Sequence, residues 1–312
     1  MRARRRLWLT ELSSSNTKDG RRARYRSVSQ YNQYVKCPYS YWLQRKQRAW
    51  QRPAAWLPQG TAVHYAAEVW ELSGREMALE EAQAEYRRKY AEEVSAMASE
   101  TPNFSYWFSS GPYDGETDTN RRYEIGLEQV AAYVEYYTSS APEEVIWIAP
   151  DGRPAIELEF DIDLDGVRLK GFIDQVTLVK DKVPKPLTPS GKPSKSKKAL
   201  EEYAAAVEAS PLRPRPRDVK TGNQPGDDFQ LGVYDVALDE LFGIKADIGD
   251  YWMARKGGPT GGYDLTQWTR ERVTEEFHWL DAKIEAEEFP PLPEPDKCRM
   301  CSVGNACDFF AG

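Results

Sequence analysis

The sequence has little cysteine, little histidine and no long apolar run. Its 312 residues include four cysteines and two histidines, and no stretch approaches the roughly eighteen apolar residues of a membrane helix. The N-terminal arginines are followed by only three apolar residues, Leu7 to Leu9, which is too short for the core of a signal peptide. We therefore expect a soluble, cytoplasmic protein with no membrane partner, whose thiols stay reduced.

A nucleotide-binding P-loop is also missing. Its G-x4-G-K-[S/T] pattern does not occur, because Gly191-Lys192 is followed by Pro193 and has no glycine at the required spacing before it. The chain therefore has no ATP-driven motor of this type. What the sequence does contain is 40% hydrophobic and 12% aromatic residues, enough to build the core of one large domain or two small ones.

Positive charge is concentrated in two segments, although the whole chain is acidic with a formal net charge of −7. Residues 1–26 contain nine Lys or Arg against two acidic residues. Residues 180–217 contain ten against four, together with seven of the 21 prolines. Basic, proline-rich segments are commonly flexible, and they can also follow a phosphate backbone. Each segment therefore has two open interpretations, a solubilising linker or a nucleic-acid contact.

Hydrophobic periodicity predicts a mixed α/β fold. From residue 155 apolar and acidic residues alternate, and Asp165-Gly166 is a strong hairpin turn. The predicted strands are 156–164, 167–179, 217–220 and 248–254. The predicted helices are 29–47, 60–72, 76–97, 121–137, 227–242 and 266–288, with a further one at 199–209 and a loop at 101–120. This order indicates helices packed around a small mixed sheet.

The four cysteines form a distinctive pattern. Cys37 stands alone near the start, whereas Cys298, Cys301 and Cys307 form C-x2-C-x5-C near the end. In a reducing compartment four thiolates are better explained by a metal than by disulfides. One distant cysteine plus a group of three favours an iron–sulfur cluster over structural zinc, which commonly uses two C-x2-C pairs. Zinc and unconnected core cysteines remain the alternatives. A cluster would clamp the first helix to the end of the chain.

A second pattern is Asp218-Val219-Lys220. Residues two apart on a strand face the same side, so the Asp218 carboxylate and the Lys220 ammonium project together. This arrangement suits a carboxylate that binds a divalent metal beside a lysine that positions or deprotonates water, although a surface ion pair is the common alternative. Asp174 lies among apolar residues on the second hairpin strand, where an unpaired carboxylate is costly. Either a metal or an Arg or Lys partner would compensate it.

Three further residues are candidates for the same site. His64 lies near the start of a predicted helix, and a neutral imidazole completes a metal site built from two aspartates, although most isolated histidines are structural. Gln230 and Tyr234 stand four apart on a predicted helix, so they share one face. They either contact a phosphate or base, or pack the helix on the sheet. His278 is interpreted as a packing or surface residue.

Taken in order, these patterns resemble the RecB-like branch of the PD-(D/E)XK nuclease superfamily, specifically its iron–sulfur members such as the AddB nuclease domain and the CRISPR-associated RecB-like exonucleases. The resemblance runs from Ser27 to Phe310. Its motifs are S-x-S-Q-Y from Ser27, Cys37-Pro38, G-x3-H ending at His64, G-F-I-D ending at Asp174, D-V-K-T-G from Asp218, Q-L-G-V-Y from Gln230, and F-P-P-L-P before the cysteine cluster.

The resemblance implies a restriction-endonuclease-like core and a metal-dependent DNA exonuclease acting on single strands or ends, in recombination, repair or phage DNA processing. It implies that His64, Asp174 and Asp218 bind Mg²⁺ or Mn²⁺, that Lys220 is the catalytic lysine, and that Gln230 and Tyr234 lie on the substrate side. It further implies that Cys37, Cys298, Cys301 and Cys307 hold a 4Fe-4S cluster. Glu157 or Glu159 is the available extra carboxylate for a second metal. The alternative is a non-catalytic DNA-binding adaptor, for example in spacer acquisition.

The expected organisation is a basic arm at residues 1–26 and one nuclease domain at 27–312. Within the domain, residues 27–150 are mainly helical, 151–265 form the sheet core, and 266–312 hold a helix and the cysteine cluster. The core departs from the family pattern, because the basic insertion 180–217 separates the hairpin aspartate from D-x-K. Long insertions at strand connections are tolerated because closure entropy rises slowly with length. DNA is the expected partner, with a helicase or recombination protein as a further one.

Overall fold

The computed structural model describes all residues except 1–24, 181–183 and 189. The basic arm expected at residues 1–26 therefore lies outside the described residues, apart from its last two. The longer helices are α2 (Val28–Lys36), α4 (Trp56–Leu72), α5 (Leu79–Glu100), α6 (Gly115–Glu135), α7 (Lys197–Ala209), α8 (Asp228–Phe242) and α9 (Arg270–Glu285). The short ones are α3 (Pro38–Tyr41), η2 (Trp42–Lys46), η3 (Phe104–Tyr106), η4 (Tyr136–Ser140), α10 (Pro295–Arg299) and η5 (Gly304–Ala306). No helix of the described part has the length and apolar character needed to cross a bilayer.

The strands form one mixed sheet, as the sequence predicts. They are β1 (Tyr25–Arg26), β2 (Val145–Ile146), β3 (Ile156–Leu164), β4 (Val167–Lys180), β5 (Leu212–Lys220), β6 (Ile248–Met253), β7 (Gly258–Pro259) and β8 (Tyr263–Asp264). The central order is β1-β4-β5-β6-β7, with β2 and β3 also paired to β4 and β8 paired to β6. Strands β3 and β4 form the expected hairpin, and Asp165 and Gly166 turn it with φ of 54° and 99°.

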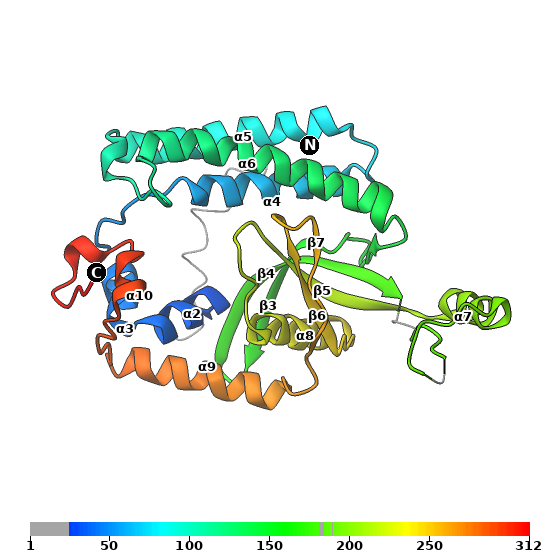
Figure 1. Ribbon diagram of the computed structural model, residues 1–312. Helices are drawn as coiled ribbons and strands as arrows, with labels where there is room; N and C mark the ends of the chain where they lie inside the picture. Colours follow the sequence, from blue (N-terminus) through cyan, green and yellow to red (C-terminus); the bar gives the residue numbers. More distant parts are fainter. Residues whose placement is uncertain (1–24, 181–183, 189) are drawn as a thin grey trace.

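Helices cover both faces of the sheet (Figure 1). On one face α8 and α9 pack on the strands, with Phe229 and Leu231 of α8 buried in the larger core. On the other face α4, α5 and α6 form a bundle whose core includes Val219 of β5 and Trp252 of β6. Alternate residues of β6 therefore serve the two cores, with Tyr251 and Met253 in the larger one and Trp252 in the bundle core. The predicted mixed α/β class is confirmed.

Several expected boundaries are wrong for local reasons. The helix expected at 29–47 is broken at Cys37, because Pro38 cannot donate the next helical hydrogen bond and instead begins α3. The loop expected at 101–120 contains the start of α6, where the Asp114 side chain accepts a hydrogen bond from Thr117 N at 2.7 Å and caps the helix. A loop-like composition concealed this cap.

The insertion expected at 180–217 is also too long, because Leu212–Lys220 is the strand β5. Pro214 and Pro216 lie on a part of this strand that pairs with β4 but not with β6, which joins only from Arg217 onward. A strand with one free edge tolerates proline, because the missing N–H can point away from the paired neighbour. The helix expected within the insertion exists as α7, which stands away from the sheet on an arm (Figure 1) and has no buried residue.

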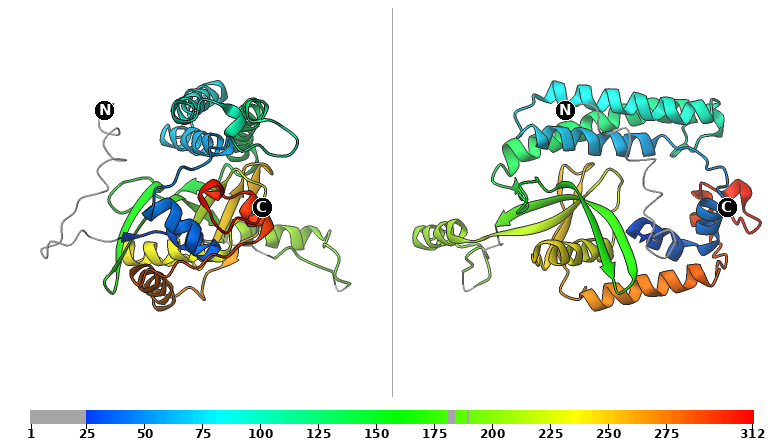
Figure 2. Two further views of the ribbon diagram at one scale, coloured as in Figure 1. Left: turned by 90° about the vertical axis from the view of Figure 1, so that its left-hand side faces the viewer. Right: turned by 180° about the vertical axis from the view of Figure 1, so that it is seen from behind.

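The C-terminal segment packs against the region of α2 and α3. In both views of Figure 2 the C-terminal segment lies beside the segment that contains α2 and α3. The backbone N–H of Arg52 donates to Ser302 O at 2.7 Å, and Gln44 Nε2 donates to Ser302 Oγ at 3.0 Å. The Tyr39 and Phe309 rings meet edge to face at 5.1 Å. These contacts join parts of the chain that are far apart in sequence.

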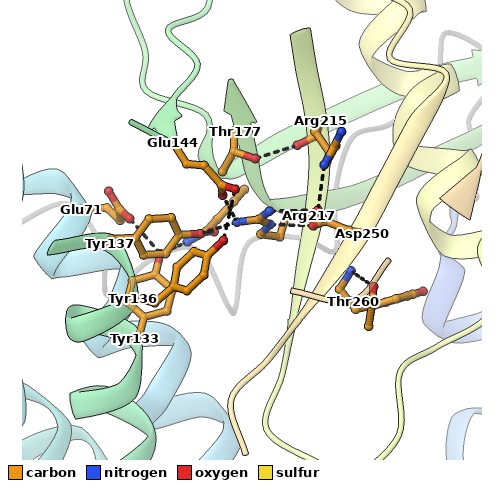
Figure 3. Close-up of polar contacts among 12 residues, drawn as sticks. Glu71, Tyr133, Tyr136, Tyr137, Glu144, Thr177, Arg215, Arg217, Asp250 and Thr260 are labelled. Atoms are coloured by element: carbon orange, nitrogen blue, oxygen red, sulfur yellow. Dashed lines mark hydrogen bonds and ion pairs between the residues drawn. The ribbon is translucent and has the colours of Figure 1, made fainter. Parts of the chain in front are cut away.

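A buried ion-pair network ties the helical bundle to the sheet (Figure 3). Arg217 of β5 is completely buried, and its guanidinium donates to the Asp250 carboxylate of β6 at 2.6 and 2.9 Å. It also donates to Tyr137 OH at 2.8 Å and to Glu144 at 2.7 Å, both from the segment after α6. Because Arg217 directly precedes Asp218, this network fixes the backbone of the candidate site from the bundle side.

Candidate active site

Three groups that can bind a metal meet from separate elements. His64 comes from α4, Glu157 from β3 and Asp174 from β4, and one ligand atom of each lies within 4.8 Å of the other two. His64 Nδ1 lies 3.4 Å from Asp174 Oδ2 and 3.8 Å from Glu157 Oε1. Two carboxylates and one imidazole form a hard, oxygen-rich donor set, which suits Mg²⁺ or Mn²⁺.

Hairpin register brings the two carboxylates together. Glu157 stands opposite Asp174, between the paired positions Ile156–Gln175 and Leu158–Ile173. Its φ of 45° lies in the left-handed region, which is unfavourable for a residue with a side chain. Such strain persists only where the surrounding structure fixes it, and it is common at functional sites.

Strand β5 places an ion pair beside these three residues. Asp218 Oδ2 and Lys220 Nζ are 2.7 Å apart, as expected for side chains on one face of a strand. Asp218 is 3% exposed, whereas Lys220 is 30% exposed, so the ammonium reaches the surface. Between them, the backbone N–H of Val219 donates to Asp174 Oδ2 at 2.9 Å. This hydrogen bond joins β5 directly to the Asp174 carboxylate on β4.

Helix α8 supports the Asp218–Lys220 pair. Gln230 accepts a hydrogen bond from Lys220 Nζ at 3.2 Å, and its amide nitrogen donates to Asp218 Oδ1 and to Tyr234 OH. The Tyr234 hydroxyl in turn donates to Asp218 Oδ1 at 3.4 Å, and its ring is buried. Both side chains therefore hold the aspartate and lysine in place, and both also line the groove beside Lys220.

The charges at this site perturb one another. Burial by itself would lower the pKa of His64, but the carboxylates of Asp174, Glu157 and Asp218 raise it to about 9. Burial raises the pKa of Asp218 to about 6, and the Asp174 charge adds to the effect, while Lys220 opposes it. Burial also raises the pKa of Asp174, with His64 opposing that shift. A group of carboxylates held this close favours a bound cation.

The unsatisfied carboxylate of Asp218 is a second observation that fits a bound cation. Besides its ion pair with Lys220, Asp218 Oδ2 is buried and accepts no hydrogen bond from any described residue. A buried carboxylate oxygen without hydrogen bonds is costly in a folded protein. His64, Glu157 and Asp174 would therefore hold the ion, with Asp218 alongside them.

A groove of about 640 Å³ opens next to Lys220, Gln230 and Tyr234. Its walls come from β1, α2, β3 and β4, and they include Lys170 and the exposed ring of Phe172. Phe172 is 49% exposed, which is unusual for a phenylalanine next to a polar site. The groove therefore offers both a cationic and an aromatic surface beside the ion pair.

The four cysteines line a different cavity, of about 320 Å³, between α2 and α10. Burial raises the pKa of Cys301, and the neighbouring thiols Cys37, Cys307 and Cys298 add to the shift. However, among the described residues no three of these sulfurs lie within 4.8 Å of one another. A mononuclear zinc site, with Zn–S bonds of about 2.3 Å, needs sulfurs closer than that. The structure thus brings the cysteines to one cavity but does not form a zinc site.

The structure arranges the expected ligands differently from the sequence-based set. His64 and Asp174 come together as expected, but the third member of the group is Glu157, and Asp218 pairs with Lys220 beside it. Glu157 was one of two candidates for an extra carboxylate, and periodicity alone did not separate it from Glu159. The Arg217 network was not anticipated. The sequence feature that could have indicated this network is Arg217, which directly precedes the D-x-K motif and therefore lies on the face of the strand opposite to Asp218.

Comparison with known families agrees with this fold. Residues 25–183 match the family described as the PD-(D/E)XK nuclease superfamily, and the chain belongs to that superfamily. The matched segment includes His64, Glu157 and Asp174 but ends before Asp218 and Lys220, which the structure supplies from β5.

The chain is also similar along most of its length to two phage proteins. It is 48% identical to the Gene 69 protein of Mycobacterium phage D29 over 293 residues, which cover 91% of this chain and 97% of that protein. It is 45% identical to the Gene 69 protein of Mycobacterium phage L5 over 312 residues, covering 91% of this chain and 96% of that protein.

Proposed function

We propose that this protein is a metal-dependent deoxyribonuclease that hydrolyses phosphodiester bonds as an exonuclease, on single strands or at DNA ends. The observation that carries the proposal is the convergence of His64, Glu157 and Asp174 next to the Asp218–Lys220 pair. A carboxylate-rich metal site beside an exposed ammonium is the arrangement that phosphodiester hydrolysis requires, because the reaction adds negative charge at phosphorus.

Each residue of the site has a separate role in the proposed reaction. His64, Glu157 and Asp174 would hold a Mg²⁺ or Mn²⁺ ion, which would supply Lewis-acid stabilisation when bound. Lys220, which is the more exposed member of its pair, orients the attacking water through its ammonium group. Asp218 keeps the lysine in position, and Gln230 holds both groups through hydrogen bonds to each.

The groove supports a single strand or a frayed end as substrate. It adjoins Lys220, and its exposed Phe172 ring presents a face or edge on which an unpaired base can stack. Bases in an intact duplex are already stacked on one another and cannot use such a ring. The chain has no P-loop of its own, so a helicase or recombination protein would supply unwound DNA. The phage relatives favour a role in phage DNA processing.

We further propose that the cysteines bind a 4Fe-4S cluster with a structural role. The cavity that they share joins the segment after α2 to the last residues of the chain. One distant cysteine together with the C-x2-C-x5-C group suits a cluster with one thiolate per iron. A cluster bound in this cavity would fix the position of α2. Helix α2 also lines the substrate groove.

Cleavage of labelled single- and double-stranded DNA in Mn²⁺ tests the nuclease proposal. We expect the wild-type protein to cut, and Lys220→Ala to cut about 10²–10⁴-fold more slowly. Lys283→Ala, which removes an exposed lysine of α9 paired with Glu288, is the matched control and should cut normally. If wild type and Lys220→Ala both leave DNA intact, the protein is a non-catalytic adaptor. If both cut equally, the active site lies elsewhere.

A further inference from the structure

A second cavity, of about 360 Å³, begins where the catalytic strand ends. Lys220 is the last residue of β5, and the next three residues, Thr221 to Asn223, line this cavity. Gly60 of α4 also lines it, four residues before His64, so the two share a helix face about 6 Å apart along the axis. The cavity is therefore adjacent to both the lysine and the metal-ligand histidine.

Two arginines give this cavity positive charge. Arg122 of α6 and Arg255, just after β6, both line it. Asp118 lies within ion-pair distance of Arg122, at 3.6 Å, but the same carboxylate bonds Arg121 more closely, at 2.7 Å. Arg255 is exposed and has no ion pair or hydrogen bond with any described residue. Arg121 and Arg122 thus share the Asp118 carboxylate, and no acidic residue of the described part lines the cavity beside Arg122 and Arg255, so the cavity keeps excess positive charge.

A chain of buried hydrogen bonds connects Arg122 to the end of β5. Arg122 donates to Gln59 Oε1 at 3.0 Å, and Gln59 donates to Gln129 Oε1 at 2.6 Å. Gln129 then donates to Thr221 O at 2.9 Å. Gln59 and Gln129 are 1% and 2% exposed, so these bonds are shielded from water. The guanidinium is consequently held at a fixed position relative to the residue that follows Lys220.

Arg122 is held among polar partners. Its side chain is 12% exposed, its two terminal nitrogens donate to Gln59 and to Ser110 Oγ, both at 3.0 Å, and its buried Nε lies 3.6 Å from Asp118 without a hydrogen bond to any described residue. Burial lowers its pKa, and the nearby charges of Arg121 and Arg255 add to that shift against the opposing effect of Asp118. An arginine nevertheless stays protonated at neutral pH. An anion in the cavity would relieve the repulsion between these groups and accept hydrogen bonds from the exposed Arg255 guanidinium.

We propose that this cavity binds a phosphate of the DNA strand next to the scissile one, with Arg255 and Arg122 as its cationic contacts. The inference rests on the proposed nuclease function and adds a subsite to it. Paired guanidinium donors are the side chains best suited to a phosphate. Gly222 leaves open space, with no atom within 4 Å of the position that a Cβ would take, so a sugar–phosphate backbone can approach the peptide. A phosphate bound in this cavity would determine which phosphodiester bond of the same strand lies beside Lys220.

Binding of fluorescent single-stranded oligonucleotides in EDTA tests this subsite without relying on cleavage. We expect Arg255→Gln to weaken binding about three- to ten-fold at low salt and to lower the slope of log affinity against log salt by about 0.7, the loss of one phosphate contact. Arg87→Gln, which changes an exposed arginine of α5 outside the cavity, is the control and should leave both quantities unchanged. Arg122→Gln should have the larger effect, and its thermal unfolding shows whether it folds.

Oligonucleotides with a 5′-phosphate, a 3′-phosphate or hydroxyl groups at both ends identify the source of the phosphate. If the wild type prefers one phosphorylated end and Arg255→Gln loses that preference, the pocket binds a terminal phosphate. If Arg255→Gln weakens all three equally, it binds an internal one.

The subsite proposal is wrong if Arg255→Gln and Arg122→Gln both fold and bind DNA with the affinity and salt slope of the wild type. That outcome would leave the nuclease proposal intact if cleavage still requires Lys220. The converse outcome is that both arginine variants bind DNA more weakly while Lys220→Ala cleaves normally. That outcome would support the subsite and contradict the proposed active site.

Discussion

The carboxylate site and the cysteine-lined cavity differ in how the protein holds their reactive groups. At the carboxylate site, neighbours hold each group: Val219 N–H bonds Asp174, while Lys220 and Gln230 contact Asp218. At the cavity, the four sulfurs are spread over its lining, and the segments that carry them are joined by a few hydrogen bonds and ring contacts. The sheet thus preorganises the first site, whereas the second depends on what links its sulfurs.

This difference has an energetic consequence. Register in the hairpin and in β5 sets the carboxylate site, and the two cores around the sheet support it. The cysteine cavity connects the chain ends and adds little to those cores. We therefore expect the two sites to respond independently to mutation, and the following predictions test that independence from the largest effect to the smallest.

Cys301→Ser should abolish the absorbance near 400 nm of protein purified without oxygen, because a cluster ligand is lost. The C-terminal segment should then become sensitive to limited proteolysis, while Mn²⁺ affinity at the carboxylate site stays close to wild type. Met300→Leu, at an exposed neighbouring position, is the control and should keep the colour. A colourless wild-type protein that carries stoichiometric zinc contradicts the cluster proposal.

Arg217→Met should destabilise the fold by about 3–5 kcal/mol, because it removes the closest cation from Glu144 and from the buried Asp250, which keeps only its longer contact with Arg215, at 3.5 Å. Urea unfolding measures this loss. Arg153→Gln, which breaks an exposed pair with Asp151, should change the free energy of unfolding by less than about 1 kcal/mol. Equal effects of the two substitutions would show that the Arg217 network does not couple the bundle to the sheet.

Glu157→Gln should weaken Mn²⁺ binding in calorimetry by at least the roughly 10–100-fold that loss of an outer-shell partner costs, since it removes a charged ligand itself. Glu159→Gln changes the same residue type two positions along β3, on the wall of the groove, and should bind Mn²⁺ normally. The pair of variants decides which glutamate belongs to the metal site. Weaker binding in Glu159→Gln alone would contradict the site described here.

Asp218→Asn should stabilise the metal-free protein while it slows DNA cleavage. The pKa of Asp218 is raised from its usual 3.8 to about 6, so ionisation weakens the folded state. That part of the stability is present below about pH 4 and is lost as the pH rises through about 6. In EDTA at pH 8 we expect Asp218→Asn to gain about 1–2 kcal/mol in urea unfolding.

Asp151→Asn is the control with the opposite sign for this pH dependence. Arg153 lowers the pKa of Asp151, so ionisation of this aspartate favours the folded state and its replacement should give no gain at pH 8. A loss of stability in Asp218→Asn at pH 8 would mean that the pairing with Lys220 outweighs burial and repulsion from Asp174.

Sequence analysis identified the parts of the fold that depend on local patterns. Alternation and the Asp165-Gly166 turn predicted the β3–β4 hairpin, and the period of the apolar residues predicted α8 and α9. It failed where a cap or a free strand edge overrides composition, as at Asp114 and at the prolines of β5. The free edge of β5 depends on where β6 pairs, which no short window of sequence contains, whereas the Asp114 cap is a local contact within a segment of loop-like composition.

The candidate site shows the same limit. Motifs pointed to His64, Asp174, Asp218 and Lys220, which the fold brings to one region. They did not distinguish Glu157 from Glu159, because the left-handed backbone of Glu157 arises only in the folded hairpin. They also gave no indication of the Arg122–Arg255 cavity, whose members lie on separate elements and share no motif.

The most direct measurement is anomalous diffraction from crystals soaked in Mn²⁺ with a short oligonucleotide. The account predicts a manganese peak bonded to His64, Glu157 and Asp174, with a phosphate of the strand beside Lys220. A manganese ion bound elsewhere, with the imidazole and both carboxylates unliganded, would contradict it.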